Sequence, residues 1–192
     1  MGGVKILRSD AFAAILGSPP GFADNARAAL WHDRIVARVF RRCSAVVPFR
    51  LGMEIRSEAE VHSLLGLNAS ELSRQLRRFR GRVEMGLKAQ VASAVGDELL
   101  RLPFGVGCVH ALASRSVDRR ERLSGSRHGT TFEGCYLISR RAVDPFWRAL
   151  DEIRRAVPEV PLLGSGPWAP YSFCDAPLRC SAEQTQVALE SR

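Results

Sequence analysis

The chain has 192 residues, of which 46% are hydrophobic and 25% charged, a composition that excludes a disordered protein. Its apolar runs are far shorter than the about 20 residues of a membrane-spanning helix, and its N-terminal segment lacks the apolar stretch of a signal peptide, so we expect a cytoplasmic protein without a transmembrane segment. The net charge of +8 favours an acidic partner only weakly, because all but two of the 28 basic residues are arginines, a skew that GC-rich coding alone can produce.

The first quarter of the chain is predicted to hold one strand and two helices. A short apolar run at 4–7 indicates a strand, and residues 9–16 are predicted to form a brief helix capped by Ser9 or Asp10. From Asp24 to about Cys43, apolar residues recur at intervals of three and four, which predicts an amphipathic helix.

An alternating segment follows at 44–56. Apolar and polar residues alternate there with a period of two, which predicts a strand with one buried face. Pro48 cannot donate a hydrogen bond to a neighbouring strand, so we expect it at the start or the edge of the sheet.

Two capping boxes predict two helices after this strand. Ser57 with Glu60 opens the first helix, and Asn68 with Glu71 opens the second, which is expected to end near Gly81. Each box pairs a helix-capping side chain with an acidic residue three positions later.

The rest of the chain is predicted to form a second set of helices and strands. Alternation at 82–91 indicates a strand, and the weak pattern around Pro103 indicates a domain junction. The remaining elements expected, in chain order, are a helix at 109–117, a polar turn at 123–130, a strand at 131–139, a helix opened by Asp144 and Pro145, and a strand at 159–163. We therefore expect an α+β protein with one domain at 1–91, a second at 92–174 and a flexible tail at 175–192.

Chemistry-bearing residues form no recognisable catalytic or cofactor site. Five scattered cysteines without a C-x-x-C pair indicate neither a disulfide framework nor a zinc site. The four histidines lie in different elements without a partner four residues away, and the glycine pairs at 105–107 and 164–166 lack the rest of a dinucleotide or phosphate-binding motif. We expect no catalytic residue, no metal and no cofactor, and a hydrolase has no constellation to support it.

An arginine-rich segment is the strongest candidate for nucleic-acid binding. Its arginines surround Phe79, and they are Arg74, Arg77, Arg78, Arg80 and Arg82. An amphipathic helix with Phe79 in the core explains the same spacing and is favoured, so nucleic acid is disfavoured as a partner. An arginine-rich nucleic-acid-binding module remains the alternative function.

The stretch "GSGPWAPYSFCD" at 164–175 is the least expected feature of the chain. It gathers Trp168, Tyr171 and Phe173 where Pro167 and Pro170 make a helix or a central strand unfavourable. Aromatic side chains of this size require apolar contact, so the stretch is expected to lie against the protein's own core or against a partner. A proline-rich ligand for another protein's groove is the alternative.

Three motifs resemble the gas vesicle protein family GvpL/GvpF. The segment "GPWAPYSF" is similar to the family's closing signature Gly-Pro-Trp-Pro-Pro-Tyr-Ser-Phe, with Ala169 in place of one proline. Residues 32–52 resemble its helix and Val-Pro-Phe-Arg-Phe-Gly strand, with Leu51 for the second phenylalanine, and residues 81–90 resemble its Gly-Arg-Val-Glu strand. The signature residues implied are Pro48, Phe49, Arg50, Gly52, Glu84, Gly86, Lys88, Gly166, Pro167, Trp168, Pro170, Tyr171 and Phe173.

This resemblance implies an accessory protein of gas vesicle assembly without enzymatic activity. Such a protein is expected to bind the small hydrophobic shell protein and other accessory proteins, to prevent shell-protein aggregation or help nucleate the shell, and to be a minor component of the vesicle. The resemblance also implies two ferredoxin-like domains, the first incomplete because this chain begins close to the family's second strand. Trp168, Tyr171 and Phe173 are expected to anchor the irregular C-terminal segment on the second domain.

Overall fold

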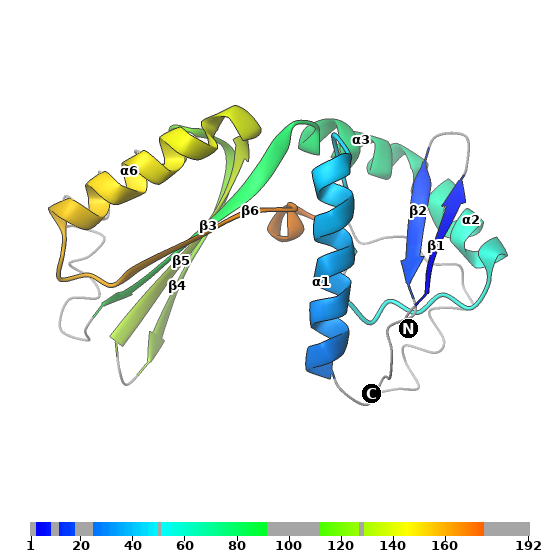
Figure 1. Cartoon of the computed structure of the whole chain (residues 1–192), viewed down its shortest axis with the longest axis horizontal. Coiled ribbons are helices and arrows are strands. Elements are labelled where there is room, and N and C mark those ends of the chain that lie inside the picture. The colour runs from blue at the N-terminus through cyan, green and yellow to red at the C-terminus, as the bar shows by residue number, and fades with distance from the viewer. Residues whose placement is uncertain are drawn as a thin grey trace. The chain divides into compact units, whose positions relative to one another are not determined.

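The computed structural model describes residues 3–8, 12–17, 25–49, 51–91, 112–126 and 129–174. These residues form two compact units: the first holds the residues up to Arg78 together with Cys174, and the second runs from Phe79 to Phe173. Each unit contains one antiparallel sheet, which confirms the predicted α+β class (Figure 1). The elements are β1 (Val4–Arg8), β2 (Ala13–Gly17), α1 (Asn25–Arg42), α2 (Glu58–Leu67), α3 (Ala69–Phe79), β3 (Arg82–Val91), β4 (Ser116–Ser126), β5 (Gly129–Ser139), η3 (Arg140–Ala142), α6 (Val143–Ala156), β6 (Leu162–Trp168) and η4 (Tyr171–Phe173).

The first sheet is a two-stranded hairpin of β1 and β2. The strand at 4–7 is confirmed, but the helix predicted at 9–16 is wrong, because Ala13–Gly17 pairs antiparallel with β1. Ala14 and Leu16 then pack against the buried cluster around Leu7. A five-residue apolar segment gains more from such pairing than from a helix too short to be stable alone.

The strand predicted at 44–56 is also wrong. Among the described residues 44–49 and 51–56, none lies in a strand. Gly52 has φ +91°, in the left-handed region, and this conformation is incompatible with a continuous strand. Part of the predicted burial survives, because Phe49 and Ile55 pack against the cluster of Leu7, Val61, Leu65 and Leu72.

Helices α1 and α2 of the first unit follow the predicted signals. The amphipathic pattern from Asp24 to Cys43 corresponds to α1. At α2 the Ser57 hydroxyl accepts a hydrogen bond from the Glu60 N–H at 3.1 Å, and the Glu60 carboxylate accepts one from the Arg56 N–H at 2.6 Å. At the second predicted box, Asn68 ends α2, and its side-chain amide donates to the Leu64 carbonyl at 2.7 Å.

The second sheet is four-stranded and antiparallel, with the order β4-β5-β3-β6. The strands predicted at 82–91 and 131–139 are confirmed as β3 and β5. The helix predicted at 109–117 is wrong in its last part, since residues 116–126 form β4 along the whole length of β5. Helix α6 lies across one face of this sheet (Figure 1), where the rings of Tyr136 and Phe146 are 5.7 Å apart.

The bounds of the last helix and the last strand differ from the prediction, since α6 begins one residue earlier and β6 three residues later than expected. Helix α6 begins at Val143, with Asp144 in its first turn rather than at the N-cap. Strand β6 runs to Trp168 and includes Pro167, which an edge strand tolerates because its outer side needs no donor.

The division between the units also differs from the expected boundary after residue 91. Strand β3 pairs with β5 and β6, so residues 82–91 belong to the second unit. The predicted junction at 92–107 and the tail at 175–192 lie outside the described residues. No helix in the described part of the chain is both long and apolar enough to cross a membrane.

Candidate functional site

Glu84, Gly86 and Lys88, the signature residues of the motif at 81–90, lie on one face of the second sheet. Residues paired across neighbouring strands point to the same face, and Gly164 of β6 is paired with Leu87 of β3. Trp147 and Leu150 of α6 lie directly against Gly164, so Leu87 faces the helix. Alternation then places Glu84, Gly86 and Lys88 on the opposite face, which we call the open face.

The closing signature at 166–173, which we call the signature segment, lies on this open face. Hydrogen bonds between Ser172 and Glu84 hold it there. The Ser172 N–H donates to Glu84 Oε2 at 2.8 Å, and the Ser172 hydroxyl donates to Glu84 Oε1 at 2.7 Å. Glu84 is 7% exposed, and both carboxylate oxygens accept a hydrogen bond. A buried carboxylate requires such partners, so Glu84 and η4 stabilise each other.

Phe173 anchors the C-terminal end of the signature segment by burying its side chain. Its side chain is fully buried, and the guanidinium carbon of Arg120 lies 5.5 Å from the centre of its ring, within the range of a cation–π contact. Arg120 is paired with Cys135 across β4 and β5, and Cys135 with Gly86, so Arg120 also belongs to the open face.

The other signature residues of this segment differ in exposure. Pro170 is fully buried and Tyr171 is half-buried, whereas Trp168 remains 46% exposed. Phe173 and Pro170 therefore hold the segment, and Trp168 presents much of its ring to solvent.

Gly166 and Pro167 shape the last part of β6, before η4 begins. Gly166 has φ +114°, and a Cβ there would lie 2.8 Å from the Glu84 carbonyl oxygen. The register between β3 and β6 shifts between Glu84 and Gly86, and the peptide bond before Pro167 is cis. Gly86 itself leaves room for Ser165, whose Oγ would lie 2.5 Å from a Cβ at position 86.

The motif at 32–52 belongs to the first unit, not to the unit of the second sheet. Pro48 is buried and Phe49 packs against the core cluster of the first unit, while Gly52 is exposed. Arg50 lies outside the described residues. The fold therefore joins two of the three motifs in one unit and leaves the first in a different one.

Cys135 lies beside Ser172 in surroundings that disfavour its thiolate form. Its Sγ lies 3.3 Å from Ser172 Oγ, and burial raises the pKa of the thiol, with the nearby Glu84 carboxylate adding to the effect. A thiol with a raised pKa carries little thiolate at neutral pH. Within the described residues no three His, Cys, Asp or Glu side chains gather as a metal site.

A row of ion pairs continues the open face beyond the signature segment. Glu133 lies between Lys88 and Arg122 on neighbouring strands, with contacts of 3.0 and 2.6 Å. Arg122 and Lys88 hold the pKa of the Glu133 carboxyl below its usual range. Of this row, the motif resemblance identified Lys88 alone. It did not identify Glu133, Arg122 and Arg120 or the role of Ser172, because their positions depend on strand pairing rather than on local sequence.

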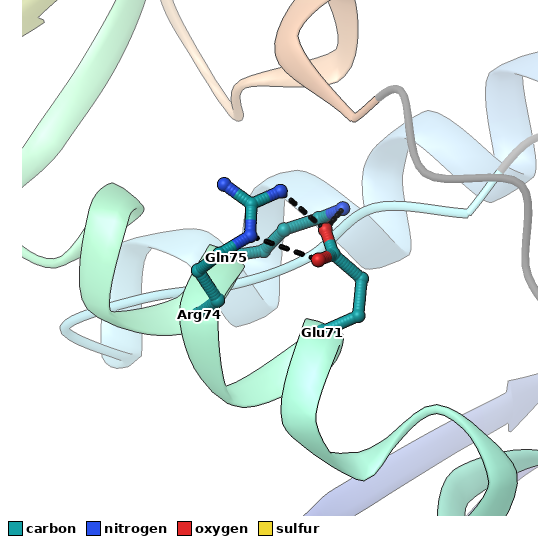
Figure 2. Close-up of polar contacts among 3 residues, drawn as sticks. All are labelled: Glu71, Arg74 and Gln75. Carbon is teal, nitrogen blue, oxygen red and sulfur yellow. Dashed lines mark hydrogen bonds and ion pairs between the residues drawn. The ribbon is translucent and has the colours of Figure 1, made fainter.

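The arginine-rich segment has a different arrangement. Phe79 is fully buried, so its ring cannot stack on a base. The Glu71 carboxylate accepts hydrogen bonds from Arg74 at 2.8 and 2.6 Å and from Gln75 at 2.8 Å (Figure 2). This placement matches an amphipathic helix with a core phenylalanine.

We expect Glu71 to titrate far below an ordinary glutamate. The hydrogen bonds from Arg74 and then Gln75 lower its pKa from 4.5 to about 2. A lowered pKa in the folded state stabilises the fold above pH 4.5, and this stabilisation is lost as the pH falls towards 2. The carboxyl ¹³C shift of Glu71, followed by NMR from pH 7 downward, should therefore have its midpoint near 2. Arg74→Ala should raise that midpoint, and a midpoint near 4.5 in the wild type would contradict the hydrogen-bonded geometry.

Comparisons with known proteins agree with the three motifs. A family model described as "Gas vesicle synthesis protein GvpL/GvpF" matches residues 2–102 and 105–175. Gas vesicle protein F2 of Halobacterium salinarum is 32% identical over 152 residues, which cover 74% of this chain and 64% of the relative. Gas vesicle protein F of Haloferax mediterranei is 28% identical over 134 residues, which cover 68% of this chain and 60% of the relative. The chain thus spans less than two thirds of the length of either protein.

Two solved structures share the fold. The crystal structure of the gas vesicle protein GvpF from Anabaena superposes with a TM-score of 0.75 at 15% identity, covering 90% of this chain and 86% of that one. The crystal structure of GvpF from Microcystis aeruginosa superposes with a TM-score of 0.76 at 14% identity, covering 90% and 89%. At these identities the likeness establishes the arrangement of helices and strands.

Proposed function

Because the chain belongs to the gas vesicle synthesis protein GvpL/GvpF family, we propose that it is an accessory protein of gas vesicle assembly that binds the small hydrophobic shell protein. In this role it keeps the shell protein from aggregating or helps to nucleate the shell, and it remains with the vesicle as a minor component. The observation that carries the proposal is the extent of the family match, which includes all three motifs.

The described surface supports binding of an apolar partner. Large hydrophobic side chains are exposed in both units, and they are Val4, Ile6, Ile15, Leu30, Leu51, Met53, Leu67, Val117, Leu123, Leu163 and Trp168. A shell protein that associates with itself through apolar strands needs an apolar partner that covers those surfaces before assembly. Association of this kind depends on buried apolar area and is only weakly sensitive to salt.

Co-purification with the shell protein tests the proposal. We expect the tagged protein, coexpressed with the shell protein, to retain it equally, within about twofold, at 0.1 M salt and at about 1 M, where the Debye length is only about 3 Å. Absence of shell protein from the eluate at both salt concentrations would contradict the proposal. Nucleic acid in the low-salt eluate that disappears at high salt would instead support the arginine-rich alternative.

A further inference from the structure

The two edges of the second sheet differ in their charge. Strand β4 forms one edge, and its centre carries the uninterrupted charged run Asp118, Arg119, Arg120, Glu121 and Arg122. Strand β6 forms the other edge, and its sequence LLGSGPW has no charged residue. Charged side chains on an edge strand discourage pairing with another chain, so β4 is protected in a way that β6 is not.

Backbone groups of β6 point outward from the sheet. The Gln90 N–H donates to the Pro161 carbonyl at 3.3 Å, and in an antiparallel pair such bonding positions alternate. The N–H and carbonyl groups of Leu162 and Gly164 therefore point away from β3. Arg154 of α6 donates to the Leu162 carbonyl at 3.4 Å, as expected for an outward-pointing group.

Apolar side chains accompany these outward backbone groups. Leu163 is 66% exposed, and its pairing with Lys88 places it on the open face. Trp168, paired with Glu84, belongs to the same face at the other end of β6. An added strand would therefore find hydrogen-bonding groups at the edge and two apolar side chains beside it.

We propose that β6 is the docking edge for the shell protein: an extended, uncharged apolar segment of that protein adds as a fifth strand beside β6. This proposal rests on the proposed function, and it names the surface that performs it. The Leu162 N–H and the backbone groups of Gly164 bond the incoming strand, while Leu163 and Trp168 contact its side chains. A segment rich in basic residues is unsuited to this edge, because Lys88 and Arg154 lie beside it.

Two matched leucine substitutions distinguish the two edges. Leu163→Glu places a charge on β6 opposite Lys88, a favourable neighbour that should preserve the fold. Leu123→Glu makes the same change at an exposed leucine of β4. We expect Leu163→Glu to reduce capture of the coexpressed shell protein by about tenfold or more, and Leu123→Glu to change it by less than about twofold.

Hydrogen exchange of the wild-type complex gives a second readout that depends on no variant. Binding of the shell protein should slow exchange of the Leu162 and Gly164 amides and leave β4 unchanged. Equal capture by Leu163→Glu and the wild type, or protection at β1 and β2 instead of β6, would overturn the docking edge while leaving the proposed function standing. Failure of the wild type to capture the shell protein at all would overturn the proposed function itself.

Discussion

Phe173→Ala is expected to lower the free energy of unfolding by about 3–5 kcal/mol, the range for removing a fully buried phenylalanine. Phe173 has no exposed surface, it belongs to η4, and its ring lies under the guanidinium group of Arg120. Its removal leaves a cavity on the open face and loosens the segment that carries Ser172. Urea denaturation followed by circular dichroism measures the loss.

Trp168→Ala is the matched control for this substitution. Trp168 belongs to the same signature but is 46% exposed, so its truncation should destabilise the protein by about 1 kcal/mol or less. Equal losses for the two variants would show that the signature does not divide into a buried anchor and an exposed aromatic residue.

Glu84→Ala is expected to destabilise the protein by about 2–3 kcal/mol, because it leaves two part-buried donors of Ser172 without their acceptor. Glu84→Gln keeps the shape and one acceptor oxygen and should lose less. Thermal and urea unfolding of the two variants measure the difference.

A double-mutant cycle isolates the contact itself. Ser172→Ala removes the hydroxyl that lies 2.7 Å from Glu84, so the double variant with Glu84→Ala should lose less stability than the sum of the single losses. Lys88→Ala, on the same face of β3 but largely exposed, is the control and should be additive with Ser172→Ala. Strict additivity of Glu84→Ala and Ser172→Ala would contradict the hydrogen bonds described.

Long periodic segments were predictable from the sequence alone. Helix α1 extends over 18 residues and β3 over 10, long enough for a period of 3.6 or 2 to be distinct. Errors fell on shorter or irregular segments and on β4, an 11-residue strand whose charged centre lacks an apolar alternation. The pattern at 9–16 predicted a helix, but pairing with β1 makes Ala13–Gly17 a strand. The alternation at 44–56 predicted a strand, which the positive φ of Gly52 interrupts.

The candidate site was predictable residue by residue but not as an assembly. Motif resemblance identified Glu84 and the aromatic residues of the closing signature, yet Ser172 bonds to Glu84 across 88 positions of the chain. Only the registers of β3 with β5 and β6, and of β4 with β5, place Arg120, Cys135 and Leu163 on the same face. The difference in charge between the two edges could not be predicted either, because sequence alone does not show which strands lie at the edges of the sheet.

Vesicle formation in cells is the most direct test of a role in assembly through the shell protein. The remaining vesicle genes are expressed with and without this chain, and vesicles are counted by electron microscopy. We expect vesicles with the wild type and with Leu123→Glu, none without the chain, and few with Leu163→Glu. A normal number of vesicles in cells that lack the chain would contradict a required role in assembly.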